Sequence, residues 1–441
     1  MTTLGEIVRQ YGPAYRAQYG EQLLPSQQAA LQAIEQCRTE ALGGHVYACP
    51  ACGTRRYSYH SCRNRHCPTC QHDATQTWLE RQEELLLPVP YFLVTFTLPS
   101  ELRDIVYRHQ RTLYTLLFRA SAAALMELAR DPRFLGAQIG LVGVLQTWTR
   151  DLRYHPHIHY LVPGGGLAED GRSWVTAKAD FLVHVKPLAA LFRAKLRAAL
   201  RQTAIWGEIP AIVWQQPWVV DCRPVGTARA ALKYLAPYIF RVALSNNRIV
   251  RVANDQVTFR YTVGATGQTA YCTLPVQEFL HRFLQHILPK GFVKVRYYGL
   301  FRVGMRRSLA RLRNQLRLLQ HSADQVPPAP VVSDGSTREV ICPSCGQPMR
   351  LERVVLPHNR GPPGWADQYE GRMLGMCRRR GAWLPIHRPA SACPGAVLKT
   401  TRTCNTGRAQ RHPALMRASA HVVNTHELRV CGHVRRQTTA E

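Results

Sequence analysis

Residues 154–162 read Tyr-His-Pro-His-Ile-His-Tyr-Leu-Val, and this segment limits the fold more than any other in the chain. A β-strand points successive side chains to opposite faces, so a strand here carries His157 and His159 on one face. Neutral imidazoles bind divalent transition metals and, with oxygen donors, can also hold Mg²⁺. We therefore expect this strand to supply two ligands of a metal site. Two histidines that merely satisfy hydrogen bonds in the core or at the surface are the alternative.

Residues 228–238 have the composition of a helix, and they carry Tyr234 and Tyr238. Side chains four residues apart share one face of a helix, although Pro237 removes a backbone N–H between the tyrosines and can kink it. A phenol that attacks phosphorus, beside a metal that polarises a phosphate oxygen, can break a nucleic-acid strand and keep its 5′ end as a phosphotyrosine. We assign Tyr234 as the first nucleophile and Tyr238 as the second; an aromatic stripe on a core helix is the alternative.

Together, the histidine strand and the tyrosine helix resemble those of the two-tyrosine HUH endonucleases, specifically the rolling-circle transposases of the insertion sequence ninety-one type. The resemblance covers about residues 30–310. It includes four further strings: Ser-Cys-Arg-Asn-Arg-His-Cys-Pro-Thr-Cys-Gln at 61–71, Leu-Gln-Thr-Trp at 145–148, Tyr-Ile-Phe-Arg-Val-Ala at 238–243 and Leu-Pro-Lys-Gly-Phe-Val at 288–293. The resemblance implies an α+β fold, in which a palm-like antiparallel sheet is flanked by helices and preceded by a small zinc-binding domain. It also implies a catalytic Mg²⁺ or Mn²⁺, and single-stranded DNA at element ends and target as substrate.

The order of the expected elements agrees with this sheet. Residues 91–98 and 139–148 are strands rich in β-branched and aromatic residues, and residues 101–130 between them are a long amphipathic helix. A polar turn at 149–154 returns the chain into the histidine strand, which a Pro-Gly pair ends.

Three residues are candidates for the third metal ligand. Gln146 is our candidate, because it lies on the preceding strand of the hairpin and could face the histidines. Asp151 is a rival, although its expected place in the turn argues against it. His155 is another, because alternation points it to the same face as His157. Two imidazoles and an amide leave positions open for water and a phosphate oxygen.

Cysteines and histidines gather near the N-terminal end, in a spacing typical of zinc ligands in an intracellular protein. Two Cys-x2-Cys pairs predict one tetrahedral zinc site, formed by Cys49, Cys52, Cys67 and Cys70. A second site could use the remaining candidates, which are Cys37, His45, Cys62 and His66. Buried cysteines and solvated histidines are the alternative for that second set.

The chain has 57 Lys and Arg against 28 Asp and Glu, a formal charge of +29 that indicates a phosphate-binding surface. Most of these cations are arginine, which grips phosphate with two parallel hydrogen bonds and stacks on bases. A GC-rich genome, which raises arginine content throughout, is a compatible second cause. The DNA contacts we expect are Arg63, Arg65, Arg241, Arg248, Lys290, Lys294 and Arg296.

We expect three regions. Residues 1–88 form a zinc-binding, DNA-binding domain that ends at a Pro-Val-Pro break, and residues 89–321 form the catalytic domain. Residues 322–441 form a basic tail with irregularly spaced cysteines, which we expect to be poorly ordered or loosely tethered by a metal. Within it, Cys342-x2-Cys345 is half of a zinc knuckle.

The sequence contains no Gly-x4-Gly-Lys-Ser/Thr string, so strand separation would come from host replication and helicase machinery. With neither an apolar run of membrane length nor a leader pattern at Met1, we expect a cytoplasmic, nucleoid-associated enzyme. A transposase is the leading hypothesis. The alternatives are a plasmid replication-initiator or relaxase-like nickase, and a non-catalytic zinc-dependent DNA-binding regulator.

Overall fold

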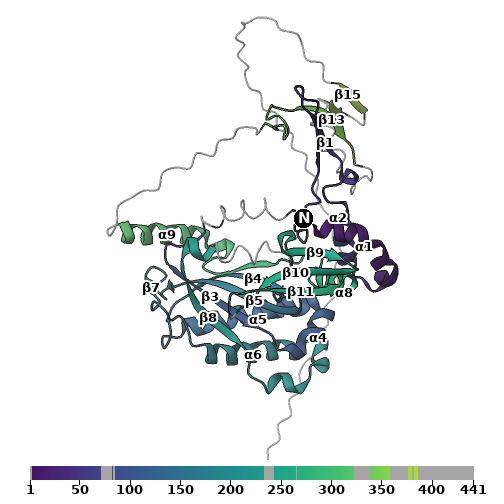
Figure 1. The fold of residues 1–441 in the computed structure, drawn as a ribbon. Helices are drawn as coiled ribbons and strands as arrows, with labels where there is room; N and C mark the ends of the chain where they lie inside the picture. The colour runs from purple at the N-terminus through teal and green to yellow at the C-terminus, as the bar shows by residue number, and fades with distance from the viewer. Residues whose placement is uncertain are drawn as a thin grey trace, which may run out of the picture. The chain divides into compact units, whose positions relative to one another are not determined.

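The computed structural model describes residues 2–70, 82, 85–232, 243–264, 266–321, 339–357, 376–379 and 382–385 (Figure 1). The chain divides into two compact units, Met1–Tyr369 and Glu370–Glu441. The described part of the second unit is a hairpin of β14 (Met376–Arg379) and β15 (Ala382–Pro385). All other described elements belong to the first unit.

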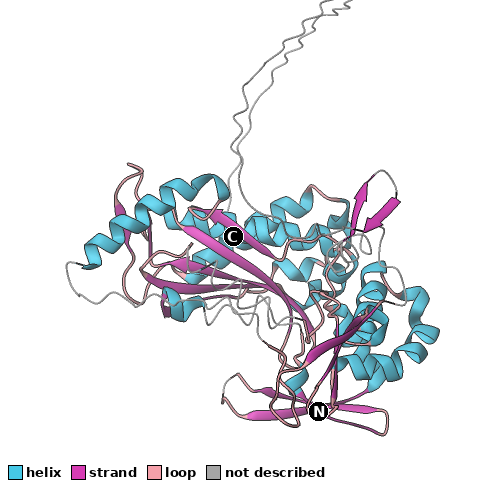
Figure 2. Cartoon of the chain, turned by 90° about the horizontal axis from the view of Figure 1, so that it is seen from above, coloured by secondary structure: helices cyan, strands magenta, loops and turns pink. Residues whose placement is uncertain are grey.

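A five-stranded antiparallel sheet forms the centre of the first unit, in the order β12-β4-β5-β3-β8. Figure 1 labels β3, β4, β5 and β8, and Figure 2 draws the strands in magenta. Its strands are β3 (Pro90–Thr97), β4 (Gly140–Trp148), β5 (Tyr154–Pro163), β8 (Val220–Thr227) and β12 (Val295–Gly299). The predicted histidine strand is β5, the middle strand. The expected α+β fold with a central antiparallel sheet is therefore confirmed.

Helices cover one face of this sheet through apolar side chains that alternate along the strands. Phe96 of β3 contacts Tyr160 of β5 and Phe192 of a helix, with ring centroids 5.7 and 5.0 Å apart. The helices on this face are α4 (Arg103–Arg108), α5 (Gln110–Arg130) and α6 (Val185–Arg201). The single helix predicted over residues 101–130 is broken at His109, whose φ of −115° and ψ of 37° are not helical.

The opposite face of the sheet buries a second apolar layer. Leu93, Val144 and Leu161 lie in one cluster with helical residues 228–232 and with the apolar side of α9 (Arg306–His321). His157 and His159 point to this same face, because they alternate with the β5 residues that pack against α5 and α6.

The N-terminal helices share a core with a later part of the chain. The elements of this core are α1 (Leu4–Tyr19), α2 (Pro25–Gln36), α8 (Val276–Gln285), β9 (Ile249–Ala253), β10 (Gln256–Thr262) and β11 (Thr269–Pro275). Trp148 and Leu152, at the end of the β4–β5 hairpin, belong to the same cluster. The expected domain boundary near residue 88 therefore does not separate two cores.

Besides the central sheet and the sheet of β9, β10 and β11, a three-stranded sheet joins an early and a late segment of the first unit. Its order is β13-β1-β2, with β1 (Gly44–Ala48) between β2 (Arg55–Tyr59) and β13 (Arg350–Val355). Val46 pairs with Tyr57 on one side and with Arg353 on the other. Residues 339–357, which fall in the region predicted to be poorly ordered, are thus part of an antiparallel sheet.

The remaining described elements are short. A small hairpin consists of β6 (Gly165–Leu167) and β7 (Trp174–Thr176), and 3₁₀ turns span Gly20–Gln22, Glu40–Leu42, Ser100–Leu102, Ala204–Glu208, Ala211–Trp214, Asn246–Arg248 and Val303–Met305. Among the described helices, none is long and apolar enough to cross a membrane.

Candidate functional site

Three predicted ligand residues lie together on the β4–β5 hairpin. Gln146 pairs directly with His157 across the two strands, and directly opposed residues of an antiparallel pair share a face. The imidazole rings of His157 and His159 stand nearly perpendicular, with centroids 4.8 Å apart. All three side chains are at least nine-tenths buried. The hairpin therefore places two imidazoles and one amide close together on one buried face of the sheet.

Hydrogen bonds fix both histidine rings. His157 Nδ1 lies 2.7 Å from the carbonyl oxygen of His155, which can only accept, so Nδ1 carries the proton and Nε2 keeps its lone pair. His159 Nδ1 lies 2.9 Å from Thr95 Oγ1 on the neighbouring strand. Such partners on the second nitrogen orient metal-binding histidines.

The pKa values of both imidazoles favour the neutral form that a metal requires. Burial lowers the pKa of His157 to about 4, although the hydrogen bond to the His155 carbonyl raises it and the His155 imidazole lowers it by smaller amounts. Burial, His157 and Arg223 lower the pKa of His159 well below its usual value. Both rings are therefore neutral near pH 7.

Gln146 offers an oxygen with no other use among the described residues. Its Nε2 donates to the Trp148 carbonyl at 2.9 Å, while its Oε1 is buried without a hydrogen-bond partner in that part of the chain. Leaving a buried amide oxygen unsatisfied costs about 1–3 kcal/mol. A divalent cation would satisfy it, so the residues fit the Mg²⁺ or Mn²⁺ that the resemblance implies.

The two rival ligands have other partners. Asp151 accepts a hydrogen bond from Thr149 and forms an ion pair with Arg153 at 2.7 Å, so its carboxylate stabilises the β4–β5 turn. His155 shares the face of His157, but the Arg103 guanidinium lies 3.3 Å from its Nδ1. Gln146 is the third ligand that the geometry favours.

The helix expected to carry the tyrosines begins on the same face of the sheet. Residues 228–232 are helical, and Ala231 and Leu232 are buried in the cluster that contains Val144 and Leu161. Val144 lies directly opposite His159. Tyr234, Tyr238 and Arg241 lie outside the described residues.

The structure divides the cysteines differently from our prediction. One cluster combines members of both predicted sets, with Sγ–Sγ distances of 3.5–3.6 Å: Cys37, Cys62, Cys67 and Cys70. The other joins one predicted pair to the tail: Cys49, Cys52, Cys342 and Cys345. The predicted set of Cys49, Cys52, Cys67 and Cys70 is therefore wrong.

The β1–β2 hairpin explains this division. Cys49 and Cys52 lie at its tip, whereas Cys37 precedes it and Cys62 follows it at its base. Five residues of strand span about 17 Å, too far for one metal ion to bridge tip and base. The sequence carried a signal that we did not use: the string Cys-Pro-x-Cys-Gly at 342–346 matches the Cys-Pro-x-Cys-Gly string at 49–53.

His45 and His66 belong to neither described cluster. His45 lies in β1 with its ring 5.2 Å from that of His60. His66 Nε2 accepts a hydrogen bond from the Leu288 N–H at 3.3 Å, and desolvation lowers the pKa of His66 to about 3. The predicted second set of Cys37, His45, Cys62 and His66 is thus corrected to Cys37, Cys62, Cys67 and Cys70.

Four of the expected DNA-binding cations have partners within the protein. Arg65 donates to the carbonyls of Phe292 at 2.6 Å and Pro289 at 3.0 Å. Lys294 lies 5.0 Å from the Trp148 ring centroid, and desolvation lowers its pKa to about 7. The other two contact aromatic rings and backbone carbonyls: Arg248 with Phe259 and Arg260, and Arg296 with Phe118 and Val293. Arg63, Arg65 and Lys290 are exposed.

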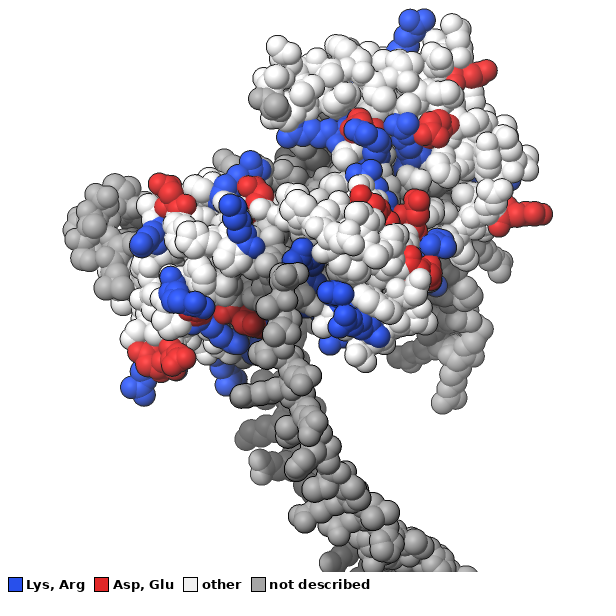
Figure 3. All heavy atoms as spheres, turned by 90° about the horizontal axis from the view of Figure 1, so that it is seen from below, with Lys and Arg blue, Asp and Glu red and all other residues white. Residues whose placement is uncertain are grey.

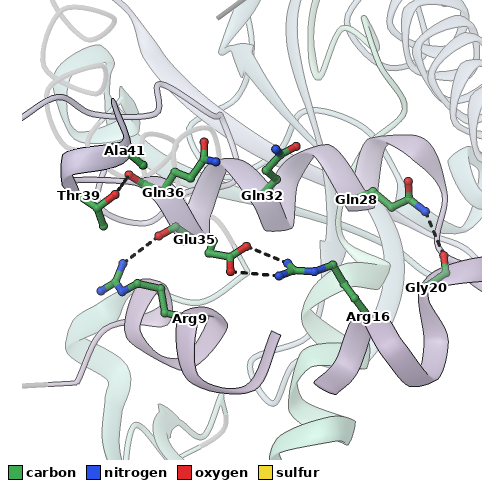
Figure 4. A pocket seen from close by; sticks show the side chains of 9 residues that line it. All are labelled: Arg9, Arg16, Gly20, Gln28, Gln32, Glu35, Gln36, Thr39 and Ala41. Carbon is green, nitrogen blue, oxygen red and sulfur yellow. Dashed lines mark hydrogen bonds and ion pairs between the residues drawn. The ribbon is translucent and has the colours of Figure 1, made fainter. Parts of the chain in front are cut away.

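Neither the charge on one face of the molecule nor the hollow between α1 and α2 marks a separate site. On the face drawn in Figure 3, Lys and Arg side chains are spread among Asp and Glu. A hollow of about 710 Å³ lies between α1 and α2, where Arg9 donates to the Glu35 carbonyl and Arg16 forms an ion pair with the Glu35 carboxylate at 2.9 Å (Figure 4). Because these groups satisfy one another, the hollow carries no sign of catalysis.

Comparison with known proteins gives two family matches. Residues 140–308 match a family described as putative transposase, and residues 7–98 match the transposase zinc-binding domain. The first match contains the β4–β5 hairpin, and the second contains the cluster of Cys37, Cys62, Cys67 and Cys70. No solved structure matches the chain.

Two curated relatives are similar over long stretches. A putative transposase, y4qJ, of Sinorhizobium fredii (strain NBRC 101917 / NGR234) is 38% identical over 388 residues, which cover 82% of this chain and 97% of the relative. The transposase for insertion sequence element IS801 of Pseudomonas savastanoi pv. phaseolicola is 30% identical over 281 residues, which cover 60% of this chain and 67% of the relative. The chain therefore belongs to the transposase family of the insertion sequence ninety-one type, with a transposase zinc-binding domain in its N-terminal part.

Proposed function

We propose that this transposase nicks single-stranded DNA at the ends of its element and transfers the strand through 5′-phosphotyrosine intermediates, as in rolling-circle transposition. Tyr234 and Tyr238 are the nucleophiles. Gln146, His157 and His159 hold the catalytic cation.

One observation supports this proposal most strongly, namely the shared face of the central sheet. The enclosed amide oxygen of Gln146 and the neutral imidazoles lie on that face, and residues 228–232 pack on it as they lead the chain toward Tyr234. A non-catalytic regulator would have no need for a buried amide oxygen beside two neutral imidazoles.

The chemistry divides among these residues. When bound, Mg²⁺ or Mn²⁺ polarises the scissile phosphate. The Tyr234 phenol gives up its proton to water and attacks phosphorus, so a tyrosine–phosphate bond forms while the bond to the 3′ oxygen breaks. The leaving 3′ oxygen takes up a proton from water and is released as a 3′-hydroxyl. Tyr238 repeats the attack on the second end or the target. His155 and Thr95 keep the two imidazoles in orientation.

The zinc-binding domain supplies structure and a DNA surface. Cys37, Cys62, Cys67 and Cys70 would hold its zinc ion, since four close sulfur atoms suit a closed tetrahedral site. Among the cations that we expected to bind DNA, we retain Arg63, Lys290 and Arg241. Host helicases would separate the strands.

Substitution of the tyrosines tests the nucleophiles. With a labelled single-stranded oligonucleotide that carries the element end, we expect Tyr234→Phe with Tyr238→Phe to abolish the covalent DNA–protein adduct on denaturing gels. Tyr271→Phe, at a described tyrosine that is 63% exposed, is the matched control and should keep it. An adduct that persists in the double variant would refute the assignment. The single variants show the order of use.

Substitution of the histidines tests the metal site separately. His157→Ala with His159→Ala should abolish nicking in Mg²⁺ or Mn²⁺ but preserve most oligonucleotide binding, because binding depends mainly on phosphate contacts elsewhere. Normal cleavage by this variant would exclude the two histidines as metal ligands.

A further inference from the structure

Four cysteines at the tip of the β1–β2 hairpin and in the tail converge on one point. Cys49 Sγ lies 3.4 Å from Cys345 Sγ, and Cys52 Sγ lies 3.6 Å from Cys342 Sγ, although each pair is separated by at least 290 residues of sequence. All four sulfur atoms lie within 4.8 Å of one another. In a tetrahedral zinc site with Zn–S bonds of about 2.3 Å, sulfur atoms are about 3.8 Å apart.

The two contributing strings have the same local structure. In each Cys-Pro-x-Cys-Gly string the glycine has a positive φ, +70° at Gly53 and +72° at Gly346, which favours glycine over other residues. In each, the glycine N–H donates to the first cysteine's carbonyl at 2.9 Å, and the first cysteine's N–H donates to the carbonyl two residues after the second cysteine, at 2.9 and 2.8 Å. The chain therefore builds the same knuckle twice and presents both to one centre.

Polar contacts hold the knuckles against each other. Thr54 Oγ1 lies 3.2 Å from Ser344 Oγ, and Arg55 makes two hydrogen bonds to the Glu352 carboxylate at 2.7 and 2.9 Å. The apolar contribution is small, because Met349 is the only buried non-cysteine of the local cluster among the described residues, with Tyr47 and Val340 partly buried against it. A sheet of three short strands with so little core needs a covalent or metal staple.

We propose that Cys49, Cys52, Cys342 and Cys345 bind a second zinc ion, distinct from the ion of the Cys37, Cys62, Cys67 and Cys70 cluster. This ion fastens residues 339–357 to the β1–β2 hairpin, so that the tail completes a metal site begun near the N-terminal end. A single ion accounts for four mutually close sulfur atoms, whereas disulfides would join them only in pairs. The four thiols release their protons as the ion binds.

Zinc stoichiometry of the full-length chain tests the proposal. We expect two zinc ions per chain by elemental analysis of the wild-type protein, and one for Cys342→Ser with Cys345→Ser. Cys222→Ser with Cys272→Ser, at two cysteines outside both clusters, is the matched control and should retain two. One zinc ion in the wild type, or two in the Cys342/Cys345 variant, would overturn the proposal.

Two further measurements complete the test. The first does not depend on the folding of the double variant, and the second distinguishes a zinc site from disulfides. Wild-type protein reconstituted with Co²⁺ should show the tetrahedral thiolate spectrum of two ions per chain, and Cys52→Ser should remove half of its intensity. Thiol alkylation after denaturation in chelator should label all four cysteines. Two disulfides among these four residues, or a spectrum that Cys52→Ser leaves unchanged, would refute the second site.

Discussion

At the scale of single residues, Gln146 tests the metal site most directly. Its Oε1 is buried and has no hydrogen-bond partner among the described residues, while its Nε2 is held by the Trp148 carbonyl. We expect Gln146→Leu to lower the rate of nicking at limiting Mn²⁺ at least about tenfold, because loss of even an outer-shell partner of a metal ligand typically costs 10–100-fold. Gln146→Glu, which keeps an oxygen donor, should retain more activity.

Asp151→Asn is the matched comparison for this prediction. The Asp151 carboxylate bonds to Thr149 and Arg153 in the turn. The substitution should therefore lower the free energy of unfolding while it leaves the Mn²⁺ concentration required for nicking nearly unchanged. If Asp151→Asn raises the Mn²⁺ requirement and Gln146→Leu does not, Asp151 is the third ligand.

His286 makes stability depend on pH. It is 3% exposed, it contacts the Leu152 carbonyl through Nε2 at 3.1 Å, and burial lowers its pKa from 6.5 to about 4. Between these values the unfolded chain binds a proton that the folded chain excludes, so stability falls as pH drops from 6.5 to 4, by at most about 3 kcal/mol. His286→Gln should reduce this slope in chemical denaturation, while His157 and His66, whose pKa values desolvation also lowers, keep the rest of it. An unchanged slope would show that His286 does not contribute.

At the scale of elements, local patterns predicted the central sheet well. The segments of β3, β4 and β5 are short and show either alternating or continuous apolar side chains, so the sequence alone predicts three strands there. The short turn between β4 and β5 makes these two strands neighbours. The helix break at His109 was missed because residues on both sides remain helical in composition.

The ligand sets of the cysteines could not be read from spacing. Every Cys-x2-Cys pair can join any other, and the hairpin of β1 and β2 decides which pairs meet by separating Cys49 from Cys67. The partner of Cys49 lies 296 residues away, at Cys345. A search for repeated strings, rather than for neighbouring pairs, would have connected the two knuckles.

Arg65 connects two loops that are far apart in the sequence. Its guanidinium donates to the Phe292 and Pro289 carbonyls and so joins the cysteine loop to the loop before β12. We expect Arg65→Lys to lower the free energy of unfolding by about 1–3 kcal/mol, because a lysine cannot satisfy both carbonyls in this geometry. Urea denaturation measures this change.

Arg63 lies two residues earlier on the same loop and, like Arg65, is exposed. We expect Arg63→Gln to weaken binding to single-stranded DNA, and urea denaturation of the same variant measures its effect on the free energy of unfolding. It should also reduce the salt dependence of binding, by about 0.7 in the logarithmic slope for each phosphate that the protein no longer neutralises. If Arg65→Lys alters the salt slope and Arg63→Gln does not, the two roles are reversed.

At the scale of the whole molecule, the two cysteine clusters differ in how deeply they are buried. Cys37 and Cys67 are buried in the core that also contains Trp148 and Phe259, so this cluster connects the N-terminal helices to the end of the catalytic hairpin. The other cluster lies in a small sheet with little core, and two of its four cysteines, Cys52 and Cys345, are exposed.

This difference predicts an ordered loss of metal under a chelator, and the prediction rests on the second zinc site. We expect the ion at Cys52 and Cys345 to leave first, with little change in the main thermal unfolding transition, because few buried residues surround it. The ion at Cys37 and Cys67 should leave later and lower that transition, since a structural zinc contributes folding free energy directly. Zinc release recorded with a colorimetric chelator, in parallel with thermal scans, measures both steps. The Cys342→Ser, Cys345→Ser variant should show the later step alone, and loss of the Cys37 ion first would contradict the order that the burial of the two clusters implies.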